Sequence, residues 1–223
     1  MVRASDRRTY AAKFAPWVPR SEQACELICG QLAEVVGAPA PGSELLELTQ
    51  DLLDAEPRLR FQDGARPSAG LAVGTRYMGD FDAPPTEWSA RLGLVADADL
   101  AGIVVFDTWL GVTDRHPGNY AFNWESGDIR LASIDFASAL QGTSGTKPAV
   151  SDVAEIAAVL SRDWAAVEAP LQAVERVTDD EIQASVDVVP SDWLAPADRD
   201  RIAAYLSHRR GELRPVLKEA ANG

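Results

Sequence analysis

Three polar side chains stand beside apolar runs in residues 111–140: Asp114, Asn119 and Asp135. The amide of Asn119 and the carboxylate of Asp135 are hard oxygen donors, which Mg²⁺ combines with water and phosphate oxygens in its coordination shell. The carboxylate of Asp114 can accept a proton from an attacking hydroxyl group. Together these residue types suit the metal-assisted transfer of a phosphoryl group to an alcohol.

Each of these residues also has an ordinary structural interpretation. Asp114 could form an Asx turn at the exit of a helix, Asn119 could cap a strand, and Asp135 could satisfy backbone donors. Any one of these interpretations is at least as good as a catalytic role when it is taken alone. The presence of all three residues, with Arg115 and His116 beside the first, favours a shared site.

The elements around these residues predict that the chain folds back on itself. Residues 97–112 are apolar on nearly all sides, as expected of a buried helix, and Asp114 follows directly. Residues 119–124 and 129–134 are strand-like and are joined by a four-residue turn, which predicts a hairpin. A hairpin returns the chain to its start, so we expect Asp135 to lie close to Asn119.

The first third of the chain alternates strand-like and helical patterns. Residues 1–14 predict a hairpin whose turn is Asp6-Arg7-Arg8. Ser21 is a suitable N-cap and Gly37 a suitable C-terminal stop for a helix that has apolar residues at helical spacing between them. Strands are expected at residues 43–49 and 71–78, no element is assigned to residues 50–70, and a linker between two lobes is expected at residues 79–85.

The last third of the chain is predicted to be helical. Thr178 and Glu181 form a capping-box pattern, and residues 196–220 predict a long charged helix in which Pro215 introduces a kink or a break. Cys25 and Cys29 lie four residues apart on the first predicted helix, where disulfide geometry is poor. With no Cys or His nearby to complete a metal site, the two cysteines are interpreted as packing residues.

Composition restricts the class of protein. The 223 residues are 46% hydrophobic and 25% charged, which is typical of a globular chain of one large domain or two lobes. A formal net charge of −13 disfavours nucleic acid and anionic membrane surfaces as partners. The sequence has neither an apolar run of membrane-spanning length nor the apolar core of a signal peptide, so a cytoplasmic location is expected.

The loop Asp114-Arg115-His116-Pro117-Gly118-Asn119, the predicted hairpin and the following Ile134-Asp135-Phe136 resemble the kinase order of catalytic Asp, Asn, hairpin and metal-binding Asp. The loop is similar to that of phosphatidylinositol 3-/4-kinases. The longer stretch "FDTWLGVTDRHPGN" resembles the HipA-like kinases. The resemblance implies that Asp114 is the catalytic base and that Asn119 and Asp135 bind Mg²⁺. His116 would either assist proton transfer or brace the loop.

The same resemblance requires a Lys on an early strand and a Glu on the next helix, to bind the ATP phosphates and to hold the Lys. Lys13 in "YAAKF" fits the first requirement, although alone it would be an ordinary solvated lysine. Glu22, Glu26 and Glu34 are the candidates for the second, and Glu26 is chosen because it lies beside the apolar stripe. Met78, at the end of the strand that resembles the one leading to the hinge between the lobes, is expected to line the adenine pocket.

The resemblance implies an α+β, two-lobed, protein-kinase-like fold in a single domain of residues 1–223. Its N-terminal lobe, residues 1–80, would be a small reduced sheet with one helix, and its C-terminal lobe, residues 81–223, would be larger and mostly helical. The implied activity is ATP- and Mg-dependent phosphotransfer to a hydroxyl-bearing acceptor, a protein Ser or Thr more than a lipid. The alternatives are a catalytically weak nucleotide-binding module that acts on a partner, and a small-molecule kinase.

Two positions depart from the kinase pattern. No glycine precedes Lys13, whereas kinases cover the phosphates with a glycine-rich loop between their first two strands. Without that lid we expect a weaker grip on phosphate and slow turnover, or a protein partner that completes the lid. The second departure is Ala137, which stands where the kinase D-F-G motif has Gly.

Overall fold

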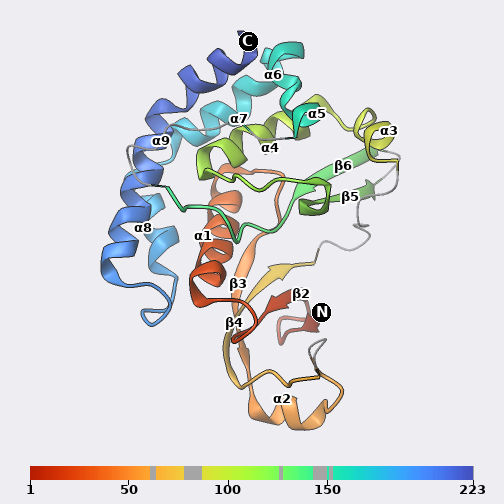
Figure 1. Cartoon of the computed structure of the whole chain (residues 1–223), viewed down its shortest axis with the longest axis vertical. Coiled ribbons are helices and arrows are strands. Elements are labelled where there is room, and N and C mark those ends of the chain that lie inside the picture. The colour runs from red at the N-terminus through yellow and green to blue at the C-terminus, as the bar shows by residue number, and fades with distance from the viewer. Residues whose placement is uncertain (61–63, 78–86, 126–127, 143–149, 151–152, 223) are drawn as a thin grey trace.

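A computed structural model describes residues 1–223 except for residues 61–63, 78–86, 126–127, 143–149, 151–152 and 223. A small lobe built on a sheet adjoins a larger helical lobe (Figure 1). The two-part α+β architecture expected from the sequence is therefore confirmed. Met78 and the predicted linker at residues 79–85 lie outside the described residues.

The sheet of the small lobe is antiparallel and has the strand order β1-β2-β4-β3. Lys13, the last residue of β2, is paired with Val73 of β4. The predicted N-terminal hairpin is confirmed, since backbone bonds close the turn between Ala4 and Arg8. The strands are β1 (Val2–Arg3), β2 (Thr9–Lys13), β3 (Ser43–Leu48) and β4 (Gly70–Arg76).

Helix α1 (Arg20–Val36) packs on β3 and β4 and also on α7 (Trp164–Arg176) and α8 (Asp179–Asp187). In Figure 1 it lies between the sheet and the helical lobe. The expectation that Ser21 caps this helix is wrong: the backbone N–H of Gln23 already donates to the carbonyl of Pro19, so helical bonding starts earlier. Gly37 ends the helix as predicted, with a left-handed φ of 66°.

A second helix in the small lobe, α2 (Gln50–Ala55), was not expected from the sequence. The hydroxyl of Thr49 caps it by accepting a hydrogen bond from the backbone of Leu52 at 3.3 Å. With six residues and only Leu53 buried, the helix is too short to show apolar periodicity. It lies at the end of the small lobe that is remote from the helical lobe (Figure 1).

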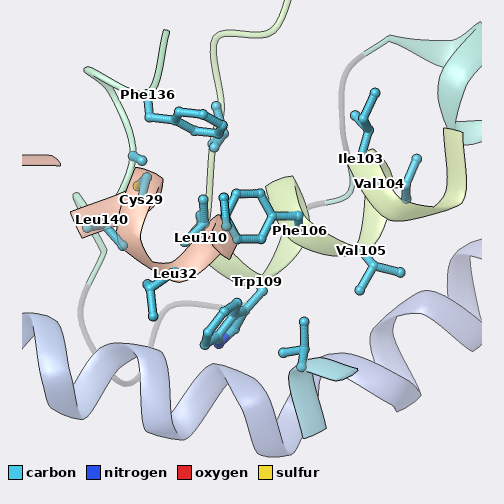
Figure 2. Close-up of a cluster of buried hydrophobic side chains, with 14 of the residues drawn as sticks. Cys29, Leu32, Ile103, Val104, Val105, Phe106, Trp109, Leu110, Phe136 and Leu140 are labelled. Carbon is cyan, nitrogen blue, oxygen red and sulfur yellow. The ribbon is translucent and has the colours of Figure 1, made fainter. Parts of the chain in front are cut away.

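Helix α4 (Asp97–Leu110) is the core of the helical lobe, and its residues from Asp99 to Leu110 are all buried. Contacts to α7 and to α9 (Pro196–Asn222) cover it. Phe106 of α4 packs against Phe136 at 5.8 Å between ring centroids, and Figure 2 shows Cys29 and Leu32 of α1 beside this pair. The remaining helices of the described lobe are α3 (Trp88–Leu92), α5 (Ala154–Ala157) and α6 (Val159–Arg162).

Two predictions about the later helices have different outcomes. The capping box is confirmed, because Thr178 and Glu181 exchange side-chain and backbone hydrogen bonds at the start of α8. A break at Pro215 is wrong, since α9 continues through this residue. Leu213 and Leu217, on either side of the proline, are fully buried and hold both halves of the helix against the lobe.

The predicted hairpin of the helical lobe is formed by β5 (Tyr120–Glu125) and β6 (Asp128–Ser133). Its register pairs Tyr120 with Ser133, and the backbone N–H of Ile134 donates to the carbonyl of Asn119 at 2.8 Å. Asp135 directly follows the strand expected at residues 129–134, whereas β6 ends one residue earlier, at Ser133. The hairpin nevertheless brings Asn119 beside the segment that contains Asp135.

Candidate active site

Lys13, Glu26 and Asp135 form a cluster that joins three distant parts of the chain. The ammonium group of Lys13 donates to Glu26 Oε1 and, at 2.8 Å, to Asp135 Oδ1. Glu26 Oε1 also accepts the backbone N–H of Phe136 at 2.8 Å. A single buried carboxylate on α1 therefore holds both the lysine of β2 and the backbone after β6.

Of the three glutamates considered on this helix, Glu26 is the one that contacts Lys13. Its side chain is 1% exposed, which is rare for a glutamate unless it is paired with a cation. Glu34 is exposed and pairs with Arg76 at 3.0 Å. The choice of Glu26 from the helical pattern thus agrees with the geometry, because its position beside the apolar stripe turns it into the protein.

The electrostatics of the cluster keep Lys13 and Asp135 charged at neutral pH. Burial lowers the pKa of Lys13, but the charge of Glu26 and the hydrogen bond to Asp135 outweigh it and raise the pKa above its usual value. Burial acts to raise the pKa of Asp135, but the bond and charge of Lys13 outweigh it and lower the pKa. Burial raises the pKa of Glu26, and Lys13 opposes this effect.

Asp135 has a left-handed backbone, with φ of 61°, which is uncommon for a residue other than glycine. Arg115 fixes this geometry, since its Nη1 donates to the carbonyl of Ile134 at 2.5 Å and to that of Asp135 at 3.1 Å. The guanidinium of Arg115 is in turn bound by both carboxylate oxygens of Asp107, at 2.7 and 2.8 Å. Ser133 also donates to Asp107.

The buried Arg115–Asp107 pair was not identified from the sequence. Both side chains are fully buried, and together they connect α4 to the segment that carries Asp135. The available signal was a carboxylate, Asp107, in the middle of a helix that is otherwise apolar. A buried carboxylate must be paired, and an arginine eight residues later in a loop was within reach.

The loop after α4 ends in a 3₁₀ turn, η1 (Pro117–Asn119). Asn119 Oδ1 accepts the backbone N–H of His116 at 3.0 Å, which leaves its second lone pair for another partner. His116 Nδ1 accepts the backbone N–H of Gly118 at 3.0 Å. The imidazole of His116 therefore braces the loop, and its ring carries its proton on Nε2 when it is neutral.

Asp114 is exposed and lies alongside the segment that follows Asp135. Its Oδ1 accepts a hydrogen bond from the hydroxyl of Ser138. Asn119 is bound through its backbone to Ile134, the residue before Asp135. The three residues from which the sequence argument started, Asp114, Asn119 and Asp135, are thus brought to one short stretch of chain.

A cavity of about 280 Å³ lies at this cluster, between the sheet and the β5–β6 hairpin. Alanines from both lobes line it, Ala11 from β2 and Ala121 and Ala132 from the hairpin, together with Lys13 and Asp135. Tyr77, the residue before Met78, also lines it. Apolar side chains beside a few convergent charged groups are typical of a small-molecule binding site.

A larger cavity, of about 480 Å³, lies between the loop after α1, helix α4 and helix α7. It is lined mostly by Ala, Pro and Val side chains, and the charged pair at its wall, Asp99 and Arg130, is joined by hydrogen bonds of 2.6 and 3.0 Å. The groups that could perform chemistry therefore gather at the smaller cavity.

The oxygen donors of Asp135, at the smaller cavity, and of Asn119, in the η1 turn, are of the kind that Mg²⁺ takes as ligands. Among the described residues, no group of three or more His, Cys, Asp or Glu side chains could hold a metal ion. A Mg²⁺ ion that is partly coordinated by phosphate oxygens needs only one or two carboxylate or amide ligands from the protein. The half-exposed anionic carboxylate of Asp135 and the remaining lone pair of Asn119 Oδ1 meet that need.

The part of the chain that the structure describes contains no helix long and apolar enough to cross a membrane.

Comparison with known proteins gives a match to one family model, and 24 chains among solved structures are similar to this chain. The sequence model of the HipA-like kinases matches residues 1–220 of this chain. Among curated proteins, no sequence matches it.

The structure of the Helicobacter pylori proinflammatory kinase CtkA is similar with a TM-score of 0.57 and 13% identity, over 98% of this chain and 89% of CtkA. HipA from Shewanella oneidensis MR-1, in a complex with HipB and operator DNA, gives a TM-score of 0.45 and 12% identity, over 89% of this chain and 57% of that chain. The likeness to CtkA confirms the two-lobed kinase-like fold.

Proposed function

The chain belongs to the HipA-like kinase family, and we propose that it transfers the γ-phosphoryl group of ATP to the hydroxyl group of a protein serine or threonine. The observation that carries this proposal is the convergence of Lys13, Glu26 and Asp135 on one cavity between the two lobes. A lysine shared by two carboxylates 109 residues apart links the two lobes, and it also supplies the held cation that phosphate binding requires.

Lys13 would neutralise phosphate charge, and Glu26 would hold it in place. An ammonium group has three N–H donors, and Lys13 uses two of them on Glu26 and Asp135 among the residues that the structure describes. One donor therefore remains for a phosphate oxygen. Asn119 and Asp135 would hold a Mg²⁺ ion, which when bound supplies positive charge to the phosphate oxygens.

Asp114 would orient the acceptor hydroxyl and accept its proton, because its carboxylate is exposed at the edge of the cluster. The loop bond of His116 Nδ1 directs its Nε2 away from the η1 turn, so this nitrogen could pass a proton to or from the site. Adenine would lie between Ala11 and Ala121, with Tyr77 beside it. Met78 follows Tyr77 in the sequence and stays a candidate for the adenine pocket from the sequence alone.

We further propose that residues 1–80 and 81–223 act as the two lobes of a single kinase domain in the cytoplasm. The net charge of −13 supports a protein acceptor with basic character over nucleic acid or an anionic lipid surface. A screen of basic proteins as phosphate acceptors would identify the acceptor.

One observation favours a second function, that of a nucleotide-binding module with little or no turnover. The turn between β1 and β2, from Ala4 to Arg8, contains no glycine, and Arg7 takes its left-handed position with φ of 69°. Bulky side chains there would keep this turn from closing on phosphates as a glycine-rich loop does. A module of this kind would bind ATP and act through a protein partner.

Two measurements separate these functions. A thermal-shift titration with Mg–ATP tests binding, and ADP production in the presence of a panel of basic proteins tests turnover. The kinase proposal predicts a shift in both the wild type and Asp114→Ala, with ADP production lost only in Asp114→Ala. Asp180→Ala, a change of an exposed residue on α8, is the matched control and should behave as the wild type. Binding without turnover in the wild type would favour the module, and no binding would refute both.

A further inference from the structure

Three residues of α9, Arg201, Tyr205 and Arg209, are spaced four apart and therefore lie on one face of this helix. Tyr205 and Arg209 are buried, and Arg201 is partly exposed. A tyrosine and an arginine that are both buried on a charged helix need polar partners. Their partners belong to the two segments of chain that carry the candidate site.

Arg209 holds the C-terminal end of α4. Its Nε donates to the carbonyl of Trp109 at 2.8 Å, and its Nη2 donates to the carbonyl of Thr108. The last carbonyls of a helix have no partner within the helix, and a cation at this end also suits the helix dipole. Since α4 ends at Leu110 and Asp114 follows soon after it, Arg209 fixes the start of the loop that carries the proposed base.

Arg201 holds the end of the segment that follows Asp135. Its Nη1 donates to the carbonyl of Leu140 at 3.0 Å and to that of Gly142 at 2.7 Å. Leu140 has a left-handed backbone, with φ of 62°, and its N–H donates to the carbonyl of Leu110 at 3.1 Å. A non-glycine residue keeps such a conformation only where its surroundings determine it, and here Arg201 and the end of α4 do so.

Tyr205 packs between these two segments, on glycines that leave room for its ring. A Cβ at Gly111 would overlap the Tyr205 hydroxyl oxygen, and a Cβ at Gly142 would overlap the edge of the ring. The guanidinium of Arg209 lies 5.2 Å from the centre of the same ring. One face of α9 therefore contacts both the loop after α4 and the end of the segment after Asp135.

We propose that Arg201 is a positioning residue for phosphotransfer, which sets the place of Asp135 relative to Asp114 by tying Leu140 and Gly142 to α9; this inference rests on the proposed function. Arg201 is outside the set of described residues that line the cavity at Lys13. Its loss should therefore leave nucleotide binding intact and slow the chemical step, because a displacement of about 1 Å at a reacting group can cost about 100-fold in rate.

The kinetic test compares the full wild-type chain with Arg201→Met. ADP production in the presence of a panel of basic proteins gives kcat and KM, and calorimetry gives the Kd for Mg–ATP. We expect kcat to fall about 10- to 100-fold while the Kd is unchanged. Arg201→Lys should restore most of kcat, because a single nitrogen of Arg201 makes both bonds and an ammonium nitrogen can replace it.

Arg199→Met is the matched control. Arg199 lies on the same helix, is also partly exposed, and donates to the carbonyls of Val186, Val189 and Pro190 at 3.1, 2.7 and 2.8 Å. These carbonyls belong to the end of α8 and the loop after it. Arg199→Met therefore loses bonds of the same kind and should keep the kcat of the wild type. An equal fall of kcat in both variants would assign Arg201 a general structural role and overturn the inference.

A second variant reaches the same contact from the opposite side. Gly142→Ala keeps Arg201 but places a methyl group against the ring of Tyr205, so it should also lower kcat and leave the Kd for Mg–ATP unchanged. A normal kcat in both Gly142→Ala and Arg201→Met would overturn this inference and leave the kinase proposal intact. Absence of turnover in the wild type would overturn both.

Hydrogen exchange of backbone amides gives a readout without nucleotide. Arg201→Met should speed exchange at Leu140, whose N–H is bound to α4, and leave exchange at Val189 as in the wild type. Arg199→Met should have the opposite pattern, because Val189 bonds to Val186 at the end of α8. Unchanged exchange at Leu140 in Arg201→Met would contradict the hold of α9 on this segment and overturn the inference.

Discussion

The ammonium nitrogen of Lys13 lies 2.8 Å from Oδ1 of Asp135, although 122 positions separate the two residues in the chain. The contact joins the last residue of a strand in the sheet lobe to the segment that leaves the hairpin of the helical lobe. Glu26 contacts both parts, since it accepts hydrogen bonds from Lys13 and from the backbone N–H of Phe136, the residue after Asp135. The relative position of the two lobes and the charge of the cavity between them therefore depend on the same three side chains.

Replacement of Lys13 by Met should weaken nucleotide binding. A charge-assisted hydrogen bond contributes about 1.5–3 kcal/mol, so we expect a Kd for Mg–ATP about 10- to 100-fold higher. Calorimetric titration measures this Kd. The titration is done at a temperature at which circular dichroism shows that the variant is folded. Lys218→Met, on the exposed side of α9, is the control, and an equal loss in both variants would count against a phosphate-binding role for Lys13.

Replacement of Asp107 by Asn should destabilise the fold strongly. The variant leaves the guanidinium of Arg115 buried without its carboxylate, and breaking a buried pair in this way costs about 3–5 kcal/mol. Urea unfolding measures the loss. Asp198→Asn is the comparison, because Asp198 and its partner Arg201 are 52% and 34% exposed and such surface pairs contribute about 1 kcal/mol or less. Similar losses for the two variants would contradict the positioning role given to the buried pair.

Two glycine-to-alanine changes should have opposite effects on stability. A Cβ at Gly30 of α1 would lie 2.4 Å from the backbone nitrogen of Ser43, so Gly30→Ala should force α1 away from β3 and cost about 1–3 kcal/mol. A Cβ at Gly211 of α9 meets nothing within 4 Å, so Gly211→Ala should stabilise the helix by about 1 kcal/mol. Thermal unfolding of both variants tests the packing of α1, and stabilisation by Gly30→Ala would refute it.

The two cysteines should not react in the folded protein near neutral pH. Burial raises the pKa of Cys25 to about 12 and that of Cys29 well above its usual value, so neither thiol forms the reactive thiolate. We expect slow alkylation by iodoacetamide at pH 8 in the native chain and rapid alkylation of both thiols in urea.

The raised pKa values of the two thiols also predict the direction in which stability changes with pH. The unfolded chain loses thiol protons before the folded chain does, so this contribution to stability falls as the pH rises above about 9. Cys25→Ala should therefore reduce the alkaline loss of Tm relative to the wild type. Rapid native alkylation at pH 8, or an unchanged alkaline profile, would contradict the burial of these thiols.

Local patterns were enough to predict most elements near the site. The hairpin that brings Asn119 beside Asp135 follows from two strand-like runs and a short turn, and the choice of Glu26 follows from its place beside an apolar stripe. Both predictions rest on patterns of residues that are close together in the sequence, so they can be made without knowledge of the tertiary structure. The confirmed left-handed stop at Gly37 and the Thr178–Glu181 capping box are of the same kind.

Features that depend on tertiary contact could not be predicted. Arg115 appeared only as a neighbour of Asp114, and its bonds to Asp107 and to the backbone of Asp135 require the loop to be packed on α4. The bond from Ser138 to Asp114 likewise requires two segments of the fold to meet. The start of α1 was misplaced at Ser21 because Ser is a good cap in general, whereas here the chain enters the helix from Pro19 without a side-chain cap.

The proposal that Asp135 binds Mg²⁺ at a nucleotide site is tested most directly by the magnesium dependence of binding. The measurement is calorimetric titration of a non-hydrolysable ATP analogue with and without Mg²⁺, on the wild type, on Asp135→Asn and on the exposed control Asp180→Asn. We predict that Mg²⁺ strengthens binding in the wild type and in Asp180→Asn, and that Asp135→Asn loses this increment. An equal increment in all three proteins, or no binding of the analogue by the wild type, would contradict the account.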